Sequence, residues 1–200
     1  MEFNFSLKFQ LAERPYASRH YAALCAWEST GVRVLADRRG RMRAEFVRRA
    51  PSARTAMRRA MGEAVCLFPS AQVVEAAPDY VTLSQVARIF RMSRQAMRKR
   101  MLAFDCRFPA PVHEANGAIW HLAEILEWMD RASGAFYARS VLEVARAAAG
   151  VNLAVETRRM RAVRSGTWDL IDLPRQVERN QRTRACTVAG LALGLPHSTR

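Results

Sequence analysis

The first eleven residues of the chain alternate between polar and apolar side chains. The apolar members, which share one side, are Phe3, Phe5, Leu7, Phe9 and Leu11. This period of two is typical of a β-strand that buries one face. The segments 32–35 and 41–47 predict two further strands, joined by a turn at 37–40. The segment 71–76 predicts a fourth strand.

Two segments between these strands carry apolar residues at the spacing of an α-helix. In the first, 18–29, the residues predicted to face the core are Tyr21, Leu24, Cys25 and Glu28. Ser52 is expected to cap the second helix, which runs to about Phe68. Its predicted inward-facing residues are Ala53, Ala56, Met57, Ala60, Ala64 and Val65.

The predicted elements follow the order β-α-β-β-α-β over residues 1–77. This order is typical of the split β-α-β, or ferredoxin-like, sandwich, in which one antiparallel sheet carries both helices on the same face. We therefore expect an α+β protein whose N-terminal unit, residues 1–77, has this fold.

A second unit, predicted over residues 78–132, begins with two short helices. Thr82 and Gln85 have the spacing of a capping box at the start of the first helix, predicted over 83–90. Ser93 is expected to cap the second helix after a turn of three or four residues, which makes a helix-turn-helix. The side chains predicted to project outward from this second helix are Arg94, Gln95, Arg98 and Lys99.

A β-hairpin is predicted after the helix-turn-helix. The segments 108–113 and 118–120 flank Ala115, Asn116 and Gly117, and an Asn-Gly pair is a strong hairpin signal. A hairpin in this position is a wing, so residues 78–132 are predicted to form a winged helix-turn-helix that a helix over 122–129 closes.

One more helix is predicted over residues 133–162. Its apolar stripe consists of Val141, Val144, Ala145, Ala148, Val151 and Val155. The basic tail, residues 163–200, has no clear period, and we expect it to be poorly ordered. The stripe and the polar face of the N-terminal sheet both offer self-complementary surfaces, so we expect a homodimer.

The charge of the chain points to a polyanionic partner. The 32 basic residues outnumber the 18 acidic ones, which gives a formal net charge of +14, and only Lys8 and Lys99 are lysines. Residues 79–110 hold seven basic and two acidic residues, whereas 111–130 hold four acidic and no basic ones. Positive charge therefore concentrates on the predicted second helix of the helix-turn-helix, which is the pattern of a nucleic-acid interface rather than of a uniformly solvated surface. Ten arginines in 33–59 make a second basic region, which we attribute to non-specific phosphate attraction or to solvation.

The segments VTLSQVARIFRMSRQAMRKRM and RFPAPVHEANGAIWHLAEILEWM resemble the winged helix-turn-helix of AlpA-type and excisionase-type phage regulators, which are relatives of the MerR DNA-binding domain. The resemblance covers about 50 of the 200 residues. More loosely, residues 1–130 look like a group of bacterial DNA-binding proteins with a small α+β domain before such a wing. Arg91 departs from the pattern, since these proteins usually have glycine in the turn. A positive φ at Arg91 would cost about 1 kcal/mol.

The resemblance and the helical positions together imply roles in DNA binding. Residues in the first two turns of the second helix are expected to reach base edges in the major groove, and these are Ser93, Arg94, Gln95 and Arg98. Phosphate contacts are expected from Lys99, Arg100 and Arg88. In the wing, His113 and Asn116 are expected either to touch the minor groove or backbone or to be exposed without a role.

No other pattern in the sequence predicts chemistry. The four cysteines are 40 or more residues apart, and the histidines lack cysteine or carboxylate neighbours at metal-ligand spacing, so we expect no metal site. There is no phosphate-binding glycine loop and no nucleophile elbow, so we expect neither a cofactor nor an enzyme. The chain shows no signal-peptide pattern and no apolar run of membrane-spanning length, which favours a cytoplasmic protein without a membrane partner.

These observations favour a sequence-specific protein that binds double-stranded DNA as a transcriptional regulator of phage or mobile-element type. One alternative is an excisionase-like architectural factor that bends DNA. Another, from a different class, is a protein-interaction or RNA-binding module.

Overall fold

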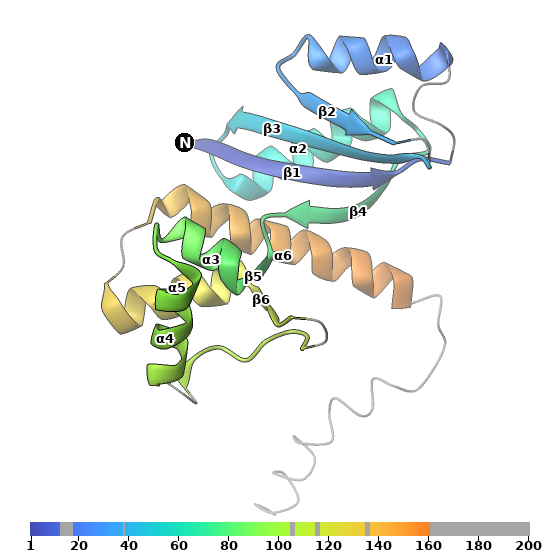
Figure 1. Cartoon of the computed structure of the whole chain (residues 1–200). Helices are drawn as coiled ribbons and strands as arrows, with labels where there is room; N and C mark the ends of the chain where they lie inside the picture. Colours follow the sequence, from blue (N-terminus) through green and yellow to red (C-terminus); the bar gives the residue numbers. More distant parts are fainter. Residues whose placement is uncertain (13–17, 38, 105–106, 115–116, 135–136, 161–200) are drawn as a thin grey trace, which may run out of the picture. The chain divides into compact units, whose positions relative to one another are not determined.

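Four antiparallel strands form the larger sheet, in the order β2-β3-β1-β4 (Figure 1). A computed structural model describes residues 1–12, 18–37, 39–104, 107–114, 117–134 and 137–160. The strands of this sheet are β1 (Glu2–Gln10), β2 (Arg33–Ala36), β3 (Arg41–Arg49) and β4 (Gln72–Ala77). The sequence predicted all four of them to within two residues at each end.

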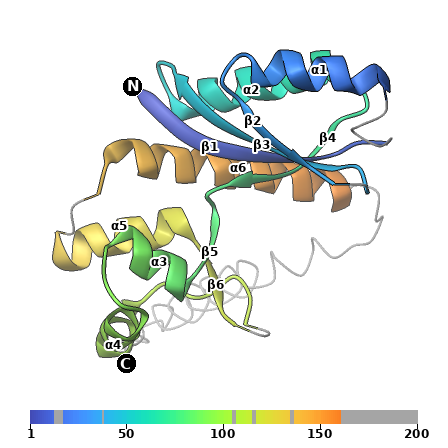
Figure 2. The same cartoon turned by 45° about the horizontal axis from the view of Figure 1, so that its top comes forward.

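Helices α1 (Ser18–Glu28) and α2 (Ala53–Leu67) cover one side of this sheet (Figure 2). The side chain of Ser52 caps α2 by accepting a hydrogen bond from the backbone N–H of Thr55, as the sequence predicted. The apolar face of β1 packs beneath the helices, and the core between them is rich in aromatic rings. This core contains Phe3, Phe5, Phe9, Trp27, Phe46 and Phe68.

Three predicted core positions, Cys25, Glu28 and Val65, are wrong, since all three are exposed. Cys25 is exposed, and Trp27 takes its place in the core, where the indole packs against Phe9, Phe46 and Phe68. Val65 is 49% exposed. The core face of α2 follows the alanines that end at Ala64, and one further residue turns the side chain by about 100° away from the sheet.

The second part of the chain contains β5 (Tyr80–Thr82), α3 (Leu83–Ile89), α4 (Arg94–Phe104), β6 (Ile119–His121) and α5 (Leu122–Ser133). The predicted capping box is present, because Thr82 and Gln85 exchange side-chain and backbone hydrogen bonds at the start of α3. Strand β5 pairs with β6 in an antiparallel two-stranded sheet that the sequence did not predict. These elements enclose a second core around Val86, Met97, Trp120, Leu126 and Met129.

The last described helix, α6 (Arg139–Met160), contributes to both cores. Val144 and Ala148 belong to the first core, and Ala145 belongs to the second. The apolar stripe predicted from the sequence is therefore used within the chain and is not free to bind a second copy. Residues Met1–Arg158 accordingly form one compact unit with two cores.

The structure is thus a mixed α+β fold with an antiparallel sheet. Within the described part of the chain, no helix combines the length and the apolarity needed to cross a membrane. The predicted tail, residues 163–200, lies outside the described residues.

Candidate nucleic-acid interface

Helix α4 begins at a well-defined cap. The Ser93 hydroxyl accepts a hydrogen bond of 3.1 Å from the backbone N–H of Ala96, and the Ser93 carbonyl accepts one from Met97. The exposed Ser93 side chain therefore helps to start the helix, in addition to any role at a nucleic-acid surface.

The turn between α3 and α4 depends on a left-handed residue. Arg91 has a φ of 52°, as a glycine-like position in this turn requires. The backbone N–H of the next residue, Met92, donates a 2.9 Å hydrogen bond back to the carbonyl of Ala87, which closes the end of α3. A side chain at this φ strains the backbone by about 1 kcal/mol, since only glycine adopts it freely.

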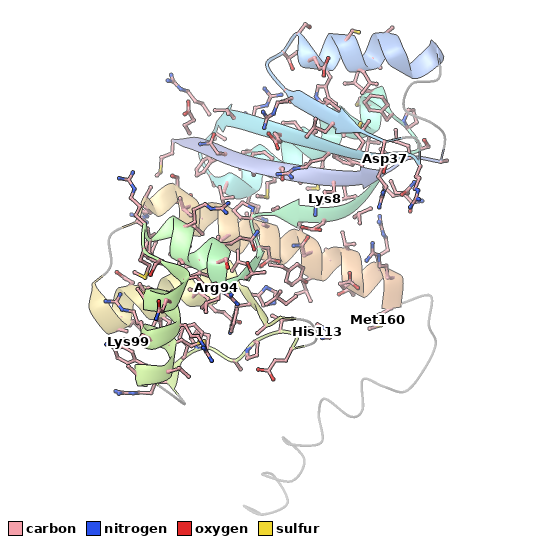
Figure 3. The ribbon with its side chains drawn as sticks, viewed as in Figure 1. Lys8, Asp37, Arg94, Lys99, His113 and Met160 are labelled. Atoms are coloured by element: carbon pink, nitrogen blue, oxygen red, sulfur yellow. The ribbon has the colours of Figure 1, made fainter. Side chains whose placement is uncertain are left out.

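One side of α4 anchors the helix, and the other is exposed. Met97 is fully buried in the second core, and Met101 is partly buried against it. The four side chains predicted to project outward, Arg94, Gln95, Arg98 and Lys99, are all exposed. Figure 3 shows two of them, Arg94 and Lys99, on α4.

The cations of this exposed side have no carboxylate partner in the part of the chain that the structure describes. Among the described residues, no carboxylate lies within ion-pair distance of Arg94, Arg98 or Lys99. Arg88, in the last turn of α3, is also exposed and has no such partner among them. An unpaired cationic surface is free to attract an anion.

The basic residues of the larger sheet differ in this respect. Glu45 pairs with Arg33 and with Arg43, and Glu75 lies 2.7 Å from the Lys8 ammonium. Most basic side chains of β1 and β3 therefore form ion pairs with carboxylates on the same sheet or on adjacent elements. The remaining pairs are Arg41 with Asp37, Arg48 with Glu63, and Arg49 with Glu2.

Asp37 shows how firmly one of these carboxylates is engaged. Desolvation acts to raise the pKa of the Asp37 carboxyl, but the net pKa is lowered by hydrogen bonds from the Arg41 backbone and guanidinium and from the Arg39 backbone. The carboxylate thus holds the β2–β3 turn together in its charged form.

Arg100 departs from its predicted placement. Its side chain is half-buried, and Nη1 lies 3.9 Å from the sulfur of Met129 on α5. The guanidinium is therefore turned toward the scaffold, because position 100 lies on the side of α4 nearer the core. Arg107 behaves similarly, with its guanidinium 5.4 Å above the Phe104 ring.

The sequence predicted a β-hairpin between residues 108–113 and 118–120, and the structure pairs these segments through an isolated β-bridge. His113 forms an isolated β-bridge with Ile119, and its side chain is exposed (Figure 3). The indole Nε1 of Trp120 donates a 3.1 Å hydrogen bond to the carbonyl of Pro109, which ties this segment to β6. Asn116, the other predicted wing residue, lies outside the described residues.

The sequence did not predict a buried polar network that joins Asp79, His121 and Asn152. Asp79 is 0% exposed, and its two carboxylate oxygens bind His121 Nδ1 at 2.7 Å and Asn152 Nδ2 at 2.7 Å. Its backbone carbonyl accepts a hydrogen bond from the N–H of Leu122, the first residue of α5. A polar Asn152 inside the apolar stripe of α6 was the only available signal.

Comparison of the chain with protein-family models, curated proteins and solved structures finds no match. Within the described residues, no three His, Cys, Asp or Glu side chains are grouped as metal ligands.

Proposed function

We propose that the protein binds double-stranded DNA with sequence preference and acts as a transcriptional regulator. In this proposal residues 78–132 form a winged helix-turn-helix, with α4 as its recognition helix. Residues 1–77 form a ferredoxin-like unit, which the element order β-α-β-β-α-β and the strand order β2-β3-β1-β4 support.

The observation that carries the proposal is the exposed cationic side of α4. Three cations, Arg94, Arg98 and Lys99, project from a helix whose opposite side is anchored by the buried Met97. The sheet arginines are mostly paired with carboxylates, whereas these three have no such partner among the described residues. A rigid helix with unpaired cations suits the major groove, which admits an α-helix.

The proposed contacts follow from positions along α4. Arg94 and Arg98 lie one turn apart, so both can face the groove from one side, where Arg reads guanine. Gln95 can read adenine, and Lys99 and Arg88 can hold phosphates. Arg100 is a weaker candidate for a phosphate contact, because its guanidinium turns toward α5.

Selection from a random duplex library tests this function. The full-length protein is expected to enrich a short shared motif, and a fluorescent duplex with that motif should then bind at least tenfold more tightly than a scrambled duplex. A change of tenfold corresponds to about 1.4 kcal/mol. Equal binding to both duplexes would contradict sequence preference, and binding to neither would contradict a DNA partner.

A further inference from the structure

A cavity of about 700 Å³ lies between α1 and α2, at the end of β3. Its volume is within the range of about 300–1,000 Å³ that small-molecule sites occupy. The apolar part of its lining consists of Ala26, Trp27, Ala50, Ala56 and Leu67. The charged part consists of Arg48, Arg49, Arg59 and Glu63.

The charges around this cavity favour an anion. Glu63 is the single carboxylate among the lining residues, and it accepts hydrogen bonds from Arg48 Nη2 at 2.9 Å and from Trp27 Nε1 at 3.4 Å. Arg49 forms an ion pair with Glu2, in which Nε lies 3.6 Å from Oε2. Arg59 is exposed and has no carboxylate within ion-pair distance among the described residues, so it remains free to bind a ligand.

Arg48 supplies an independent observation. Its Nε is enclosed by protein and has no hydrogen-bond partner among the described residues. Buried donors are nearly always satisfied, so an unsatisfied one calls for an acceptor that is absent from the free chain. The same guanidinium lies 5.5 Å from the centroid of the Phe46 ring, and its Nη2 binds Glu63.

We propose that this cavity binds a small organic anion, with its acidic group at Arg59 and Arg48 and its apolar body against Ala50, Ala56 and Leu67. Arg–carboxylate and Arg–sulfonate contacts are charge-assisted, and the apolar lining gives the ligand a surface to bury. The site lies on α1, α2 and β3 and uses none of the residues assigned to DNA.

A pair of dyes that differ only in charge tests the proposal. Anilinonaphthalene sulfonate is an aromatic anion, and N-phenylnaphthylamine is the same ring system without the sulfonate. We expect the native full-length protein to bind the anionic dye with saturable fluorescence, and to bind it at least fivefold more tightly than the neutral dye. No saturable binding of the anionic dye, or equal affinity for both dyes, would overturn the proposal.

Two neighbouring arginines of α2 provide a matched comparison. Arg59 lines this cavity, whereas Arg58, also exposed, lines a different one between α2 and α6. We expect Arg59→Ala to lower the affinity for the anionic dye about fivefold, which is the effect of one charge pair at a partly solvated site. The affinity for the neutral dye should not change. Arg58→Ala should leave both affinities unchanged. Equal effects of the two substitutions on the anionic dye would contradict the assigned site.

A substitution at Glu63 should raise the affinity for the anionic dye, whereas Arg59→Ala should lower it. Glu63→Gln removes the negative charge from the lining, so we expect the anionic dye to bind more tightly than it does to the native protein. Circular dichroism of each variant establishes that the fold is retained. Weaker binding of the anionic dye to a folded Glu63→Gln variant would contradict an electrostatic role for the arginines.

Discussion

The side chain of Asn152 on α6 makes two hydrogen bonds to the backbone of Ala76 on β4. The N–H of Ala76 donates to Oδ1 at 2.7 Å, and Nδ2 donates to the Ala76 carbonyl at 2.9 Å. Strand β4 is an edge of the larger sheet, so these bonds satisfy backbone groups that no further strand pairs with. The same Nδ2 donates to Asp79, which in turn contacts His121 on β6. One amide side chain on α6 thus connects the larger sheet to Asp79 and, through Asp79, to strand β6.

Removal of this amide should be costly. Asn152→Ala leaves the buried N–H and carbonyl of Ala76 and one oxygen of Asp79 without their partner. We expect the free energy of unfolding to fall by about 3 kcal/mol, measured by urea denaturation. The adjacent and highly exposed Leu153 is the control, and Leu153→Ala should change stability by less than about 0.5 kcal/mol. Equal losses for the two variants would show that the buried bonds contribute little.

Asp79 and Asn152 should be energetically coupled, because they share a buried hydrogen bond. In a double-mutant cycle of Asp79→Ala and Asn152→Ala, the double variant is expected to lose about 1–2 kcal/mol less than the sum of the single losses. Stability by urea denaturation of all four proteins measures this difference. Simple additivity would mean that the two residues act independently.

The strained turn before α4 offers a stabilising substitution. Arg91 is left-handed, so Arg91→Gly should relieve strain and raise the free energy of unfolding by about 0.5–1 kcal/mol. Arg98→Gly is the matched comparison, since it removes the same side chain from the interior of α4 and should cost about 1 kcal/mol. Thermal denaturation followed by circular dichroism measures both changes. A loss of stability in Arg91→Gly would contradict the strain argument.

The affinity for DNA should depend steeply on salt. If four to seven phosphates are neutralised, log affinity is expected to fall linearly with log salt concentration, with a slope of about −4 to −6. Fluorescence anisotropy with a labelled duplex at several salt concentrations measures the slope. A slope near zero would contradict phosphate contacts as the source of affinity.

The reading side of α4 can be separated from its phosphate contacts. Arg94→Ala or Arg98→Ala is expected to cost about 1–3 kcal/mol on the selected duplex and much less on a scrambled one, because a guanine contact carries sequence information. Lys99→Ala should weaken binding to both duplexes equally, since a phosphate contact carries no sequence information. Anisotropy titrations of folded variants test this contrast. Unchanged preference in both arginine variants would exclude the side of α4 that carries Arg94 and Arg98 as the reading surface.

Local patterns were sufficient to predict most elements of the fold. The alternation around Phe5, the cap at Ser52 and the capping box of Thr82 and Gln85 all depend on residues close in sequence, so their physical causes are visible in the sequence itself. The same holds for the exposed side of α4. The glycine-like position of Arg91 was expected from the family resemblance and not from a local pattern. Whether these residues bind DNA remains a prediction.

The sequence by itself determined where most of the helices and strands lie and which helix concentrates positive charge. Only the tertiary structure decided what each face meets. In the folded chain, the apolar stripe of α6 packs into both cores, and the Arg100 side chain lies against Met129. Asn152 binds the backbone of Ala76, which is 76 positions away in the sequence. The physical reason is that capping and periodicity are short-range, whereas burial and hydrogen bonding between distant segments depend on how the complete chain packs.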